Sequence, residues 1–329
     1  METLRNDLKN NRIRNLYLFY GPEEYLREYY LGNIEKKLLN TEFFSLNRIL
    51  MQGKVSNASL IDCCETLPVF SEKKLVIVKD SGFFRSKKNS GADELAGYFK
   101  NLPDYTCLIF LEDEIDKRTK TVKSVKEHGL MVEFKYQKPA DLVKWVIKVF
   151  KAKGKEIGIP AASWLVENCQ PGMTYILNEI DKVTAYTQQR DKVTIKDLEN
   201  VCIKSIKTRI FDLTDAIGQK DSTKALKLLD DMVVLREPLP IILHMISRQF
   251  RHILEMKALC SEGCSLSQAA SNIGLTPYAA KKTMQQTQNF TVDRLKKALE
   301  RCLEIDTNIK TGKINERIAT ELLIAEFSK

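Results

Sequence analysis

Residues 21–30 stand where an α/β nucleotide-binding domain would carry its phosphate loop, directly after the apolar run 16–20. Such a loop needs glycines whose backbone N–H groups approach phosphate, then a Lys for the β- and γ-phosphates and a Ser or Thr for Mg²⁺. Here only Gly21 is retained, and Arg27 and Glu28 occupy the Lys and Ser/Thr positions. Because a carboxylate repels phosphate, the sequence predicts a degenerate P-loop that neither binds nor hydrolyses ATP.

Two other parts of an ATPase site are imitated but incomplete. Residues 107–114 have the pattern of a strand whose acidic end holds Mg²⁺. Without phosphate-binding partners, we interpret them as a buried strand that ends in a solvated acidic turn. Three residues after Gly172, where a sensor arginine would stand, the chain has Tyr175. We therefore expect no catalytic residues, no cofactor and no enzyme activity; an ATPase with an unconventional site is the alternative.

Cysteine and histidine are too dispersed to predict a metal site. Cys63 and Cys64 are adjacent, and His252, Cys260 and Cys264 lack a fourth ligand nearby. Structural zinc sites use about four ligands, usually in paired spacings. With three His in the whole chain and no readable Ser-His-Asp or Cys-His grouping, we expect neither a metal centre nor nucleophilic catalysis.

Large apolar residues gather in a short connection before the apolar run 74–79. Leu67, Val69 and Phe70 lie there, next to a proline and ahead of a charged Ser-Glu-Lys-Lys stretch. One interpretation is a helix end folded onto the sheet. The other is an exposed anchor that fills a partner's pocket, as binding hot spots do.

Residues 266–284 have the pattern of a helical hairpin. Ala270 and Gly274 supply the small residue and turn glycine that let two helices cross closely. A sequence-specific DNA reader would present polar side chains at the start of the second helix. That helix opens instead with Thr-Pro-Tyr-Ala-Ala, which favours a plain hairpin over a helix-turn-helix regulator.

The elements that must position these residues alternate between strand and helix up to about residue 137. Strands are predicted at 16–20, 47–51, 74–79, 107–111 and 131–134. Continuous apolar runs separated by helical patterns predict a parallel sheet covered by helices on both faces. From residue 138 the strands are expected to stop. The sequence predicts three domains: α/β at 1–137, a small helical domain at 138–205 and a larger helical domain at 206–329.

Composition excludes several classes of protein. The net charge of +9, from 52 basic and 43 acidic residues, is spread over all three predicted domains, so backbone-level contact with nucleic acid is allowed but a dedicated DNA-binding face is not indicated. No apolar run approaches the roughly 20 residues of a membrane span. The eight cysteines lack the density of a disulfide scaffold. We expect a cytoplasmic protein with reduced thiols and no membrane partner.

The order and spacing of several short motifs resemble the delta subunit of the bacterial DNA polymerase III clamp loader over nearly the whole chain. The motifs lie at 18–26 (LFYGPEEYL), 67–70 (LPVF), 111–118 (LEDEIDKR), 172 with 177–182 (LNEIDK), 210–217 (IFDLTDAI), 248–251 (RQFR), 275–278 (LTPY) and 309–312 (IKTG). The resemblance implies an AAA+-like α/β domain with a degenerate P-loop, a helical lid and a C-terminal helical collar that oligomerises.

The same resemblance implies a function and partners. Members of this family lack ATPase activity and open the beta sliding clamp for loading onto primed DNA, together with gamma or tau and delta-prime subunits. The family's clamp-binding pair maps onto Val69 and Phe70, with Leu67 beside it. Where relatives can carry a tyrosine that stacks on the primer end, this chain offers Lys310 and Lys313, whose contact with DNA would be attraction to phosphate.

Overall fold

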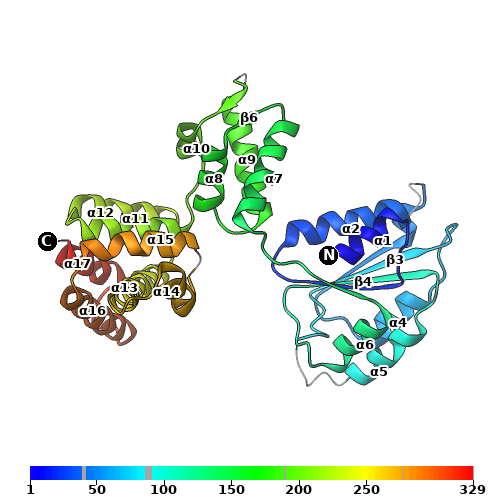
Figure 1. Cartoon of the computed structure of the whole chain (residues 1–329). Coiled ribbons are helices and arrows are strands. Elements are labelled where there is room, and N and C mark those ends of the chain that lie inside the picture. Colours follow the sequence, from blue (N-terminus) through cyan, green and yellow to red (C-terminus); the bar gives the residue numbers. More distant parts are fainter. Residues whose placement is uncertain (39–41, 86–90, 189, 276, 329) are drawn as a thin grey trace. The chain divides into compact units, whose positions relative to one another are not determined.

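A five-stranded parallel sheet organises the N-terminal part of the computed structural model, which describes residues 1–38, 42–85, 91–188, 190–275 and 277–328 (Figure 1). The strands run in the order β2-β3-β4-β1-β5, and their bounds are β1 Leu16–Tyr20, β2 Arg48–Gln52, β3 Lys74–Lys79, β4 Thr106–Glu112 and β5 Leu130–Glu133. Every residue of β1 and β4 is buried. Continuous burial requires cover on both faces, as the apolar runs predict.

Alternation along the strands divides their side chains between two helical layers. Tyr17 and Phe19 pack against α1 (Glu2–Lys9) and α2 (Glu24–Leu38). Leu18, Leu108 and Phe110 face the opposite layer, formed by α4 (Asn57–Glu65), α5 (Ala92–Tyr98) and α6 (Lys120–His128) (Figure 1). Short helices α3 (Phe44–Asn47) and η1 (Phe99–Asn101) complete this region. Because successive side chains point to opposite faces, one apolar strand supplies both cores.

Four helices follow the sheet: α7 Pro139–Ala152, α8 Ile159–Asn168, α9 Met173–Thr187 and α10 Ile195–Val201. The expectation that strands stop at residue 138 is wrong in one detail. Residues Glu156–Ile157 (β6) and Lys192–Val193 (β7) form a two-stranded parallel pair. Two-residue strands are too short to show an alternating pattern, so they cannot be predicted from periodicity.

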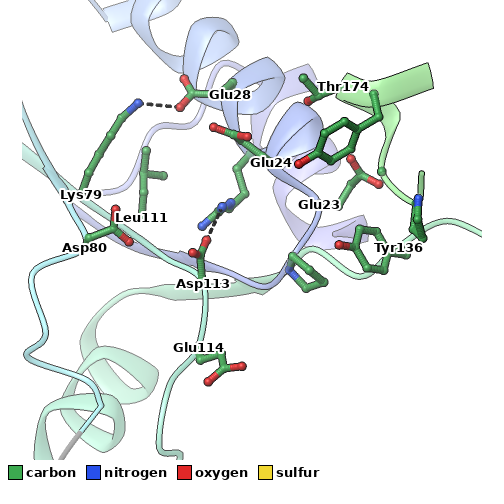
Figure 2. A pocket seen from close by; sticks show the side chains of 15 residues that line it. Glu23, Glu24, Glu28, Lys79, Asp80, Leu111, Asp113, Glu114, Tyr136 and Thr174 are labelled. Carbon is green, nitrogen blue, oxygen red and sulfur yellow. Dashed lines mark hydrogen bonds and ion pairs between the residues drawn. The ribbon is translucent and has the colours of Figure 1, made fainter. Parts of the chain in front are cut away.

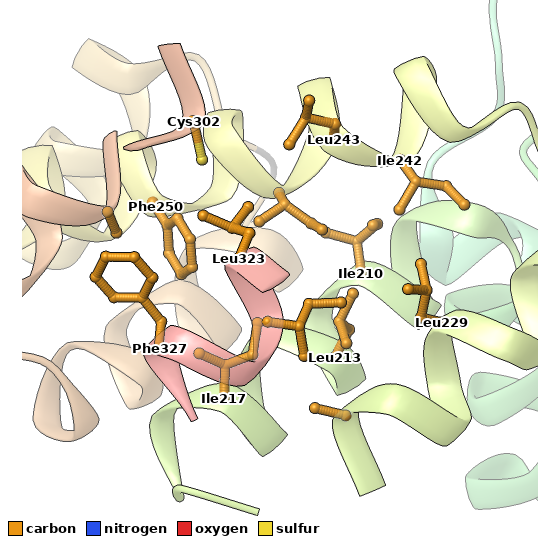
Figure 3. Close-up of a cluster of buried hydrophobic side chains, with 14 of the residues drawn as sticks. Ile210, Leu213, Ile217, Leu229, Ile242, Leu243, Phe250, Cys302, Leu323 and Phe327 are labelled. Atoms are coloured by element: carbon orange, nitrogen blue, oxygen red, sulfur yellow. The ribbon is translucent and has the colours of Figure 1, made fainter. Parts of the chain in front are cut away.

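The chain forms two compact units. The first contains residues 1–166 and 171–201, and the second contains 167–170 and 202–329. The second is entirely helical in its described residues, with α11 Ile206–Gly218, α12 Ser222–Val234, α13 Leu239–Ser261, α14 Leu266–Ile273, α15 Pro277–Gln286, η2 Thr287–Asn289, α16 Val292–Lys310 and α17 Glu316–Phe327. Its core joins residues from five of these helices, among them Leu213, Leu229, Phe250, Cys302 and Leu323 (Figure 3).

The predicted fold class, a parallel-sheet α/β region followed by all-helical regions, is confirmed. The predicted hairpin at 266–284 forms as α14 and α15, and Gly274 ends α14 in the left-handed conformation that favours glycine. Ala269, Ala270 and Ala280 of the hairpin pack against Met256 of α13. The division of the first unit at residue 138 stays a prediction.

Candidate functional site

A cavity of about 480 Å³ lies at the carboxyl ends of the strands, beside the start of α2 (Figure 2). Gly21, which follows β1, has φ +113°, and a side chain there would meet the Phe134 carbonyl oxygen at 2.5 Å. This glycine is therefore explained by close packing against the chain after β5. Gly21 stands at the position of a phosphate-loop glycine, but a glycine is needed there because the backbone packs too closely for a side chain.

The backbone N–H groups of this loop already have acceptors within the protein. The Gly21 N–H donates to the carbonyl oxygens of Glu112 (3.1 Å) and Asp113 (3.2 Å), and the Glu23 N–H donates to the Phe134 oxygen (3.0 Å). Pro22 has no N–H to offer. A phosphate cradle depends on free N–H groups that converge on the ligand, so the loop cannot provide one in this conformation.

The Glu23 carboxylate caps a helix N-terminus, a position that would otherwise attract a phosphate. The Glu23 side chain is 1% exposed, and its Oε1 accepts the N–H of Met173, the first residue of α9, at 3.0 Å. Burial raises the pKa of the Glu23 carboxyl. The N-terminus of α9, which faces this cavity, is thus capped by a side chain of the protein itself.

The residues at the P-loop Lys and Ser/Thr positions are both held in ion pairs. The guanidinium of Arg27 contacts Asp113 at 2.6 Å, and Glu28 accepts from the Lys79 ammonium at 2.6 Å (Figure 2). Glu112, at the end of β4, is fully buried and accepts from the backbone N–H (2.9 Å) and hydroxyl (2.5 Å) of Ser81. The charged groups of the predicted degenerate site are therefore engaged with one another.

The connection between α4 and β3 exposes the apolar residues singled out by the sequence. Phe70 is 81% exposed, Leu67 69% and Val69 40%. We call these three residues the apolar tip. The interpretation of a helix end folded onto the sheet does not fit these values. Since exposing a whole Phe ring to water has a free-energy cost, a cluster of this kind is typical of a binding surface.

Side-chain hydrogen bonds to the carbonyl groups at the end of α4 hold the base of the tip in place. Lys74 is 2% exposed, and its ammonium donates to the carbonyl oxygens of Cys63 (2.5 Å) and Thr66. The Thr106 hydroxyl donates to the Cys64 oxygen at 2.7 Å, and the Tyr105 hydroxyl to the Glu65 oxygen at 2.8 Å. Burial lowers the pKa of Lys74. These side chains satisfy acceptors that a helix end leaves open.

Asn47 holds the tip itself, and sequence reasoning missed it. This side chain is 2% exposed; its Nδ2 donates to the Val69 oxygen at 2.8 Å, and its Oδ1 accepts from the Val69 N–H at 2.7 Å. The next residue, Phe70, has φ +49°, a conformation that costs a non-glycine residue about 1–2 kcal/mol. Its ring lies 5.4 Å from that of Phe43. No local pattern could reveal an Asn that acts 22 residues away.

Comparison with known proteins places the chain in a family. The model for the delta subunit of DNA polymerase III matches residues 17–135, and the model for the C-terminal domain of the same subunit matches residues 207–327. The chain belongs to the DNA polymerase III delta subunit family. The resemblance noted in the sequence is thereby confirmed, and the clamp-loader family is favoured over a helix-turn-helix regulator.

Individual relatives agree with this assignment. The chain is 28% identical over 331 residues to DNA polymerase III subunit delta of Bacillus subtilis (strain 168), covering 98% of this chain and 95% of that one. A probable subunit delta of Aquifex aeolicus (strain VF5) is 22% identical over 271 residues, or 79% and 75% of the two chains. The solved structure of the Bacillus subtilis DNA clamp loader delta protein matches with TM-score 0.60 and 26% identity over 99% of both chains.

The remaining predicted residues of this delta-family chain lie at the end of α16. Lys310 and Lys313 are both exposed. The Lys310 ammonium contacts Asp306 at 2.6 Å, so its charge is partly neutralised, whereas Lys313 lies in the turn before α17. Their contact with DNA stays a prediction. Within the described residues, no helix is both long and apolar enough to cross a membrane.

Proposed function

We propose that this chain binds the beta sliding clamp through the apolar tip and opens it for loading onto primed DNA, as a subunit without ATPase activity. The presentation of Phe70 carries the proposal: its ring is 81% exposed, while the backbone beneath it is fixed by Asn47 and Lys74. An ordered apolar anchor binds with little loss of conformational entropy. Val69 and Leu67 flank this anchor.

The proposal includes partners and a division of labour. The cavity beside α2 has engaged N–H groups and internal ion pairs, which supports an assembly in which gamma or tau subunits hydrolyse ATP and delta-prime completes the complex. Residues 206–329 serve as the collar that joins these subunits, and 138–205 as the lid. Lys310 and Lys313 lie in this collar and attract DNA phosphate in the assembled loader. The cytoplasm, where DNA is replicated in bacteria, is the expected location.

The test is a binding titration of purified clamp with the wild-type chain and Phe70→Ala. A buried Phe contributes about 1.5–3 kcal/mol, and truncation of a central anchor commonly costs 2 kcal/mol or more, so Phe70→Ala should weaken binding about 30-fold or more. Leu303→Ala is the control, because Leu303 is 69% exposed on α16, outside the tip. Unchanged affinity for Phe70→Ala, with its thermal melt also unchanged, would refute the anchor role.

A further inference from the structure

A basic hollow of about 230 Å³ lies in the second unit, between the start of α11 and the middle of α13. Its lining is Lys207, Ile210, Phe211, Met245, Arg248, Gln249, His252, Gly274 and Leu275. Each titratable side chain in this lining is basic: Lys207, Arg248 and His252. The hollow is independent of the apolar tip and of the cavity beside α2, which belong to the first unit.

Lys207 and Arg248 bring two positive charges to the same hollow. Within the described part of the chain, neither Lys207 nor Arg248 forms an ion pair. Other cations of the same unit do, among them Lys204 with Asp212, Arg301 with Glu304 and Glu326, and Arg317 with Asp230 and Glu321. Like charges held together without a counter-charge repel each other, and an anion placed between them removes that repulsion.

The basic groups are close enough to affect each other's protonation. Burial, and then the charge of Arg248, lowers the pKa of Lys207. Burial lowers the pKa of His252 to about 4, with Arg248, Arg251 and Lys207 adding to the effect. His252 is therefore neutral at pH 7 and retains one ring N–H donor.

A buried polar network that includes Gln249 adjoins the hollow. Gln249 is 6% exposed, and its Nε2 donates to Gln286 Oε1 at 2.7 Å and to Thr283 Oγ1 at 3.2 Å. The Nε2 of Gln286 donates in turn to the Phe211 oxygen at 3.0 Å and to Asp215 at 2.8 Å. These polar groups already have hydrogen-bond partners within the protein, and their bonds hold α11 against α13. The basic side chains of the lining therefore remain available to a ligand.

We propose that this hollow is a phosphate-binding site. Arg248 provides a planar fork of N–H donors that matches phosphate oxygens, Lys207 a point charge and His252 a neutral donor. With about 30 Å³ per water-sized group, the hollow holds roughly eight such groups, which is room for one phosphate and a few waters. The phosphate comes either from a nucleic-acid backbone or from a small phosphate compound.

The experiment follows the His252 ring resonances of the full chain by NMR, assigned through His252→Gln, at constant ionic strength in chloride. Inorganic phosphate, pyrophosphate and a single-stranded oligodeoxynucleotide are titrated separately. Saturable shifts, with a rise in the pKa of His252 because a bound anion favours the imidazolium, are the expected result. A response to the oligonucleotide identifies a backbone phosphate, and a response to the two small ions alone identifies a small compound.

Two charge variants complete the design. Arg248→Gln should weaken the saturable response about tenfold or more, since it removes charge-assisted hydrogen bonds to phosphate. Lys296→Gln removes one positive charge from α16 of the same unit, outside the lining, and should leave the response unchanged. The proposal is overturned if none of the three probes gives a saturable shift, or if Arg248→Gln and Lys296→Gln respond alike.

Discussion

Replacing Asn47 with Ala should weaken clamp binding although Asn47 itself is buried and cannot touch the clamp. The substitution removes both hydrogen bonds to Val69, at 2.7 and 2.8 Å, and the one to the Phe43 oxygen at 3.1 Å. At about 0.5–1.5 kcal/mol each, the loss of these three hydrogen bonds lowers the free energy of unfolding by roughly 1.5–4.5 kcal/mol. The released Val69 and Phe70 backbone must then be ordered again when the clamp binds.

The cost of that ordering sets the size of the effect on affinity. Fixing one residue's backbone costs about 1–2 kcal/mol, so two residues cost about 2–4 kcal/mol, of which the remaining loop contacts of Phe70 with Phe43 recover a part. We expect a loss near 2 kcal/mol, or about 30-fold in Kd. Surface plasmon resonance on immobilised clamp measures this at a temperature where the variant is fully folded.

Hydrogen exchange separates local ordering from general destabilisation. In the wild type the Val69 N–H is bonded to Asn47 and should exchange slowly; in Asn47→Ala it should exchange at a rate close to that of an open loop. Asn57→Ala is the matched control, because the Asn57 amide donates to the Gly91 oxygen and to Glu94, and neither partner belongs to the tip. If Val69 exchanges freely in Asn47→Ala while clamp affinity equals that of the wild type, the reasoning is wrong.

Three further outcomes are expected. Isothermal titration of the chain with Mg-ATP should give no binding, because the N–H groups near Gly21 are engaged; micromolar affinity would contradict this. Removal of residues 206–329 should abolish co-purification with gamma or tau subunits while clamp binding persists. The pKa of His252 is about 4 when folded and near 6.5 when unfolded, so the unfolded chain binds more protons between these values and stability falls as pH drops from 6.5 to 4; urea melts should show a smaller fall for His252→Gln.

The sequence alone determined the class of fold and predicted a degenerate P-loop. Apolar runs such as 16–20 and 107–111 can be buried along their whole length only inside a sheet covered on both faces, and the structure has that arrangement. The P-loop prediction also needs only the sequence, because it depends on which residue types stand at positions 27 and 28. The apolar residues at 67–70 were visible too, but two interpretations of them stayed open.

Only the tertiary structure decided how those residues are held. Asn47 reaches Val69 across 22 positions, and Glu23 reaches Met173 across 150, and a single Asn or Glu gives no signal of such a distant partner. The grouping of Lys207 with Arg248 and His252 likewise arises from the packing of α11 against α13. Periodicity reports which face of an element is apolar, whereas exposure, hydrogen-bond partners and converging charges depend on which elements meet.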